Sequence, residues 1–125
     1  MQPATLPETT HYRGDRWTDG HRHFGPVLVD GGAPADPCLY CRVQFRQRKT
    51  GVFGYELNSA PAAGQGQITI TDGAAYIFDL PSQELPLAVG SWDWDFETYT
   101  TADHSDLPWT IWRGSIKIIE DVSHD

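Results

Sequence analysis

Three carboxylates alternate along one short segment of the sequence, at Asp93, Asp95 and Glu97. In a β-strand, alternate side chains point to the same face and lie about 6.6 to 7 Å apart, so these three could offer oxygens to a hard cation such as calcium. A calcium site, however, normally draws its oxygens from several loops. We therefore expect no metal, but a ladder of cross-strand ion pairs, each worth roughly 0.2–1 kcal/mol. The arginines expected to face this ladder are Arg42, Arg46 and Arg113.

Two histidines, His21 and His23, fall on the same face of a possible short strand. Two ligands alone are too few for a zinc or nickel site, and a third would have to come from elsewhere, such as His11 or Asp19. We expect solvated surface histidines. In a symmetric assembly, the same pair placed at a subunit contact would make assembly sensitive to pH.

Cys38 and Cys41 form a C-x-x-C pair, a spacing found in redox motifs and in many zinc sites. In a strand, side chains three residues apart point to opposite faces. The alternation therefore places Cys41 in the core as a small apolar side chain and Cys38 on the other face. Neither a disulfide nor a shared metal is expected of the pair.

Aromatic residues suggest a different kind of site, because flat rings stack on the sugar rings of carbohydrates. Three of the five tryptophans occupy alternating positions that are expected to face the core. The other two, Trp17 and Trp109, lie beside turns and are expected to be exposed. Together with Tyr99 they form the candidate binding patch.

Catalysis finds no support in the sequence motifs. The chain has no G-x-S-x-G elbow, no glycine-rich phosphate loop and no H-E-x-x-H pair. Asp93 and Asp95 share one ladder, whereas the two carboxylates of a glycosidase flank the substrate at about 5 to 9 Å from each other. We expect a protein that is not an enzyme and that uses no cofactor.

The charge balance argues against two classes of partner. Nine Lys and Arg stand against seventeen Asp and Glu, which gives a net charge of −8; such a field repels nucleic-acid phosphates and anionic membranes. No apolar run approaches the roughly 20 residues that cross a bilayer, and the first ten residues do not resemble a secretion signal. We expect synthesis in a cytoplasm, with no nucleic acid and no membrane as partner.

The elements that position these residues are predicted to be strands. Twelve glycines and nine prolines leave little room for helices, and apolar residues alternate with polar ones in most segments between them. The dipeptide Asp72-Gly73 between two such segments predicts a hairpin. The alternation assigns the core to Leu39, Cys41, Val43, Phe45, Phe78, Trp92, Trp94, Phe96, Ile116 and Ile118.

These segments predict about seven or eight strands, the pattern of a β-sandwich or a small barrel. A chain of 125 residues suits one hydrophobic core, and we assign the single domain to residues 13–125. Residues 1–12 contain two prolines and three threonines. We interpret them as an N-terminal arm that is ordered only where another element holds it.

Short motifs follow one another in a characteristic order along nearly the whole chain. They are Arg13-Gly14-Asp15 before an aromatic strand, the segments 39–46 and 68–72, Tyr76-Ile77-Phe78, Leu85-Pro86-Leu87, the segment 90–97, and the segment 114–118 running into 120–123. In order and spacing they resemble a family of small domains of tailed-bacteriophage tail, baseplate and neck proteins.

The resemblance implies an immunoglobulin-like β-sandwich of about seven to eight antiparallel strands that serves as a building block of the virion. The expected partners are other virion structural proteins and further copies of the chain in a symmetric homo-oligomer, with residues 1–12 ordered on a neighbouring subunit. Two alternatives stay open. One is a carbohydrate-binding module for host-surface glycans that uses Trp17, Trp109 and Tyr99, and the other is a regulator that binds a basic host protein through the acidic ladder.

Overall fold

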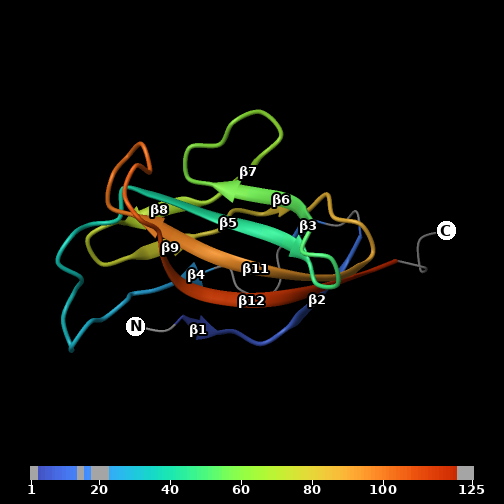
Figure 1. Cartoon of the computed structure of the whole chain (residues 1–125), viewed down its shortest axis with the longest axis horizontal. Helices are drawn as coiled ribbons and strands as arrows, with labels where there is room; N and C mark the ends of the chain where they lie inside the picture. Colours follow the sequence, from blue (N-terminus) through green and yellow to red (C-terminus); the bar gives the residue numbers. More distant parts are fainter. Residues whose placement is uncertain (1–2, 14–15, 18–22, 121–125) are drawn as a thin grey trace.

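The computed structural model describes residues 3–13, 16–17 and 23–120, and every regular element in these ranges is a β-strand (Figure 1). The prediction of an all-β protein is therefore confirmed. Among the described residues, no helix has the length and hydropathy needed to cross a membrane. The strands are β1 (Ala4–Thr5), β2 (Thr9–Tyr12), β3 (Arg16–Trp17), β4 (His23–Phe24), β5 (Tyr40–Gln47), β6 (Phe53–Asn58), β7 (Gly66–Gln67), β8 (Thr69–Asp72), β9 (Ile77–Asp79), β10 (Gln83–Glu84), β11 (Gly90–Tyr99) and β12 (Trp109–Ile119).

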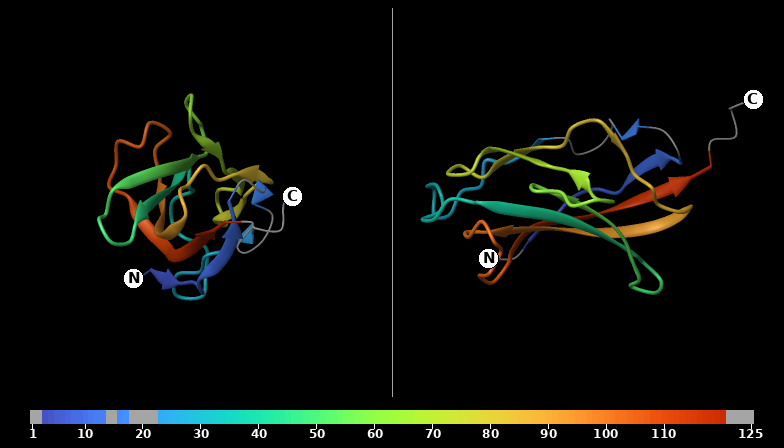
Figure 2. Two further views of the ribbon diagram at one scale, coloured as in Figure 1. Left: turned by 90° about the vertical axis from the view of Figure 1, so that its right-hand side faces the viewer. Right: turned by 90° about the horizontal axis from the view of Figure 1, so that it is seen from above.

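Seven of these strands form one large sheet in the order β1-β12-β11-β5-β6-β7, with β2 also paired to β12. A three-stranded sheet, β4-β9-β8, lies over it as a second layer, and β10 pairs with β3 (Figure 2). The turn at Asp72-Gly73 joins β8 to β9 as an antiparallel pair, as predicted. The expectation of antiparallel strands alone is wrong: β1 and β2 run parallel to β12, and β7 runs parallel to β6, because none of these pairs is joined by a hairpin.

An aromatic cluster fills the space between the two layers. The ring of Phe96 in β11 lies 4.9 Å from the ring of Phe24 in β4 and 4.9 Å from that of Phe78 in β9. Side chains that alternate with Phe96 therefore point away from the second layer, onto what we call the outer face of the large sheet. The predicted core residues that are buried are Cys41, Val43, Phe45, Phe78, Trp92, Trp94, Phe96, Ile116 and Ile118.

Leu39 does not belong to the core, since 52% of it is exposed, whereas Cys38 is buried. The strand period does not extend to these residues, because β5 begins only at Tyr40. The backbone N–H of Cys38 bonds to the carbonyl of Gly73, and that of Leu39 to the carbonyl of Tyr99. These bonds turn Cys38 inward and Leu39 outward, the reverse of the prediction.

Residues 4–12 are held by a strand of their own chain. Ala4 lies beside Trp112, and Thr9 beside Ile116, both in parallel register on β12. His11, in the middle of β2, is only 4% exposed. Within the single chain, the element that orders this segment is thus β12, the edge of the sheet formed by β5, β11 and β12.

A glycine allows the indole of Trp94 on β11 to lie flat against β12. Gly114 is the register partner of Trp94, and a Cβ atom at Gly114 would lie 2.4 Å from Cζ2 of the indole. Real Cβ atoms do not approach other atoms so closely, so any larger residue here must displace the indole.

Replacing Gly114 with alanine should lower the free energy of unfolding by about 1–3 kcal/mol, because the added methyl group overpacks the indole. Urea denaturation followed by tryptophan fluorescence measures the change. The matched control is Gly32→Ala, since nothing lies within 4 Å of a Cβ atom there, and its stability should stay within about 0.5 kcal/mol of the parent. Equal losses in the two variants would contradict the packing described for Trp94.

Candidate functional site

The outer face of the large sheet carries the predicted ladder of ion pairs. Arg42 Nε lies 2.9 Å from Glu97 Oε1, and Arg113 Nε lies 3.5 Å from Asp95 Oδ1. In both cases the arginine comes from a strand that flanks β11. Two of the expected pairs therefore form between β11 and its neighbours.

The third carboxylate pairs with an arginine that the sequence pattern did not single out. Asp93 lies opposite Arg46 in the register of β11 and β5, but its Oδ1 is 3.1 Å from Arg48 Nη2. The guanidinium of Arg46 lies instead over the ring of Phe53, with its Cζ 5.6 Å from the ring centroid. The assignment of Arg46 to the ladder is thus wrong, because a cation–π contact holds its side chain toward β6.

The pair formed by Arg42 and Glu97 differs from the others in its burial. Its side chains are 25% and 17% exposed, whereas those of Arg113 and Asp95 are about half exposed. Burial opposes the charge of Arg42, but the hydrogen bond and the charge of Glu97 outweigh it and raise the pKa of Arg42. The guanidinium of Arg42 therefore stays ionised in a partly desolvated position.

Beside Arg42, two loops rise over β5 and β6 and border an open depression of about 550 Å³, which we call the loop pocket. One wall comes from the connection between β6 and β7, and the other from the connection between β11 and β12. Its volume falls within the range of ordinary ligand-binding pockets, about 300–1,000 Å³. The residues that line it are Tyr40, Arg42, Glu56, Asn58, Ala60, Ala62, Gln65, Ala102, Asp103 and His104.

A buried carboxylate organises the floor of the loop pocket. Glu56 accepts hydrogen bonds from Gln44 Nε2 at 2.9 Å, from Asn58 Nδ2 at 2.7 Å and from Gln65 Nε2 at 3.1 Å. The same Asn58 nitrogen also contacts the hydroxyl of Tyr40. This cluster was not predicted from the sequence, where its only signal was that Glu56 and Asn58 alternate with an inward Leu57.

Aromatic rings form the side of the pocket next to β11. Tyr40 stacks on His104, with ring centroids 4.5 Å apart and an interplanar angle of 25°, and its other neighbour is Tyr99 at 5.4 Å. Arg42 lies over Tyr99. Tyr99 is consequently only 4% exposed, and the prediction that it belongs to an exposed patch is wrong, because these groups cover its ring.

Asp106 holds the loop that carries His104. Its carboxylate accepts hydrogen bonds from the backbone N–H of Thr100 at 2.9 Å, from the hydroxyl of Thr100 at 2.8 Å and from the hydroxyl of Thr101 at 2.7 Å. Together these bonds lower the pKa of Asp106 to about 2, and the bond from the backbone N–H of Thr100 contributes most. His104 itself has a φ of 48°, in the left-handed region that usually favours glycine.

The other two aromatic candidates do not join Tyr99. Trp109 lies beside Thr98 in the register of β11 and β12, hence on the inner face, and its half-buried ring is 5.5 Å from that of Tyr76. The backbone of Trp17 lies in β3, and its side chain falls outside the described residues. Trp109 and Tyr99 therefore occupy opposite faces of the large sheet, and they cannot form one patch.

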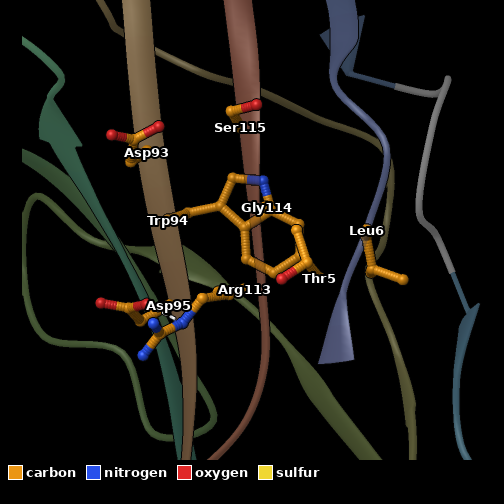
Figure 3. Close-up of a pocket in the computed structure, with 8 residues that line it drawn as sticks. All are labelled: Thr5, Leu6, Asp93, Trp94, Asp95, Arg113, Gly114 and Ser115. Carbon is orange, nitrogen blue, oxygen red and sulfur yellow. Dashed lines mark ion pairs between the residues drawn. The ribbon is translucent and has the colours of Figure 1, made fainter. Parts of the chain in front are cut away.

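A smaller groove runs along the N-terminal segment, with a volume of about 360 Å³. Figure 3 shows the indole of Trp94 crossing β12 at Gly114 toward this segment, with Asp95 and Arg113 paired at its lower end. The groove marks the seam along which the segment lies on the sheet. Its lining residues are Thr5, Leu6, Asp93, Trp94, Asp95, Arg113, Gly114 and Ser115.

The remaining candidates for metal chemistry lie apart from the loop pocket. His23 Nδ1 contacts the carboxylate of Asp79 in the neighbouring strand β9, and His21 lies outside the described residues. Cys38 and Cys41 are both buried as free thiols. The hydrogen bond that the Cys41 thiol donates to Cys38, together with burial, raises the pKa of Cys41. Among the described residues, no group of three His, Cys, Asp or Glu side chains could hold a metal ion.

Replacing Arg42 with alanine should destabilise the protein by about 1–3 kcal/mol, because Glu97 then keeps a poorly solvated charge without its partner. The matched control is Arg113→Ala, which breaks an exposed ion pair and should cost less than about 1 kcal/mol. Urea denaturation at low and high salt measures both. If Arg113→Ala lowered the free energy of unfolding more than Arg42→Ala, the claim that the less exposed pair of Arg42 and Glu97 is the more stabilising one would be contradicted.

The loop that carries His104 should lose its order only in strong acid. Since the folded-state pKa of Asp106, about 2, lies below the usual value of 3.8, its ionised form stabilises the loop above that usual value. This contribution is lost as the pH falls through about 2. The amide NMR resonance of Thr100 should titrate with a midpoint near pH 2 and lose this titration in Asp106→Asn. A midpoint near 4 would contradict the hydrogen bonds described.

Comparisons with protein-family models, with curated proteins and with solved structures each gave no significant match for this chain. Its function must therefore be inferred from the geometry of the described residues and from the motif order in the sequence.

Proposed function

We propose that the chain is an immunoglobulin-like β-sandwich that serves as a structural component of a tailed-phage virion, in its tail, baseplate or neck. The strand order supports the fold. In variable-type immunoglobulin domains, strands G, F, C, C′ and C″ form one sheet and strands B, E and D lie in the other. The orders β12-β11-β5-β6-β7 and β4-β9-β8 match these two sheets in strand order, and the direction of β7, parallel to β6, departs from them.

The contact between β4 and β11 adds to this correspondence. Antibody domains join the equivalent strands B and F by a disulfide, whereas here Phe24 packs against Phe96 with ring centroids 4.9 Å apart. An aromatic pair of this kind stabilises a core without an oxidising compartment. It is consistent with synthesis in a host cytoplasm before incorporation into a particle.

The observation that carries the assembly role is the pairing of the N-terminal segment with β12. The backbone N–H of Leu6 donates to the carbonyl of Arg113 at 2.8 Å, and that of Arg13 donates to the carbonyl of Ile119 at 2.8 Å. Such main-chain pairing at a sheet edge is also a common way for one chain to bind another. We propose that in a symmetric homo-oligomer the segment leaves β12 of its own chain and makes the same pairing with β12 of the next copy, an exchange of identical elements between subunits.

A carbohydrate-binding module that uses Trp17, Trp109 and Tyr99 is not favoured as the primary role. Tyr99 is buried, and Trp109 lies on the opposite face of the sheet. No observation on the described residues favours a regulator that binds a basic host protein, since the ladder carboxylates Asp93, Asp95 and Glu97 already pair with arginines of the same chain.

Particles produced from the genome that encodes this chain should contain it in a fixed copy number, which quantitative mass spectrometry of purified virions measures. Its absence from such particles would contradict the virion role.

Light scattering on the purified chain, followed by negative-stain imaging, should reveal symmetric assemblies. A variant that lacks residues 2–10 should remain folded by circular dichroism but elute as a monomer, because it has lost the backbone groups that pair with β12. The control Thr5→Ala keeps those backbone groups and should assemble like the parent. Full assembly of the truncated variant would contradict the role given to the segment.

A further inference from the structure

The loop pocket lies away from the strand pairing on which the proposed assembly depends. Its floor includes three buried strand residues, Tyr40, Glu56 and Asn58, and its walls come from two separate loops. The segment that pairs with β12 does not contribute to it. A ligand could therefore enter the pocket whether or not the N-terminal segment takes part in assembly.

The polar groups of the pocket are fixed before any ligand arrives. Asn58 Oδ1 accepts from the backbone N–H of Ala60 at 2.9 Å, and Gln65 Oε1 accepts from that of Ala62 at 2.9 Å. The amide nitrogens of the same two side chains donate to Glu56. The side chains that line the cavity thus also anchor its loop, and ordering them around a ligand would cost little entropy.

The free hydrogen-bonding capacity of the pocket includes both donors and acceptors. Arg42 uses Nε to bind Glu97, while its two terminal amino groups make no hydrogen bond to other described residues. Asp103 accepts hydrogen bonds from the backbone N–H and the side chain of Ser105 and from the side chain of Thr101, and the remaining lone pairs of its carboxylate can still accept. The hydroxyl groups of a sugar both donate and accept hydrogen bonds, so they can pair with the donors of Arg42 and with the carboxylate of Asp103. An apolar ligand would leave these groups unpaired.

The rings and charges of the pocket narrow the ligand class further. One face of the exposed His104 ring packs on Tyr40, so the opposite face can stack against the C–H face of a sugar ring. Glu56 and Asp103 disfavour an anion. The unused N–H donors of Arg42 require acceptor atoms, which a metal or ammonium cation does not have. We infer that the loop pocket is a binding site for a short neutral saccharide.

The inference is tested by titrating the ¹⁵N-labelled full chain with glucose, galactose, N-acetylglucosamine, maltose and lactose, one at a time. At least one sugar should shift the side-chain amide resonances of Asn58 and Gln65, with a dissociation constant of about millimolar order. His104→Gly removes the stacking ring and keeps a residue that suits the left-handed backbone. This variant and Gln65→Ala should each weaken binding at least about fivefold, roughly 1 kcal/mol.

The matched control is Leu107→Ala, since Leu107 is 90% exposed in the same loop and does not line the pocket; it should bind the sugar like the parent. The inference is overturned if no sugar shifts these resonances at tens of millimolar, or if the shifts map to Trp109. It is also overturned if phosphate, sialic acid or choline binds the pocket while every neutral sugar fails. None of these outcomes depends on assembly or on the virion role.

Discussion

The two-residue period of β11 is the constraint on which the rest of this molecule depends. One set of its side chains, Trp92, Trp94 and Phe96, enters the aromatic core, and the alternate set forms the ion pairs of the outer face. The strand is paired on both sides, with β5 and β12. A shift of its register by one residue would exchange the two sets, so burial of the aromatic rings also fixes where every outer charge lies.

The same register positions the loop pocket. At the end of β11, Tyr99 lies opposite Tyr40 of β5, and the chain then turns at Thr100, whose backbone N–H is held by Asp106. The loop is thereby directed back over β5, where His104 stacks on Tyr40. The pocket is a consequence of where β11 ends, and its shape does not require a ligand.

Alternation in the sequence was a good guide inside the long strands and a poor one at strand ends and bulges. The aromatic residues of β11 were correctly placed in the core. Leu39 and Cys38 were reversed, because alternation is informative only inside a strand. Phe53 is exposed because Gly54 forms a bulge between β5 and β6. The pocket residue Glu56 gave no clear signal, since its burial depends on two loops that fold over it from elsewhere in the chain.

Hydrogen exchange of the isolated protein, resolved by NMR, tests most directly the claim that the sheet preforms the pocket. We predict that the amides of Thr100 and Ser105, which are hydrogen-bonded to Asp106 and Thr101, are protected without any ligand, as are the amides of β11. If β11 were protected while Thr100 and Ser105 exchanged at the rate of an unstructured chain, the pocket would not be preformed, and the central claim would be contradicted.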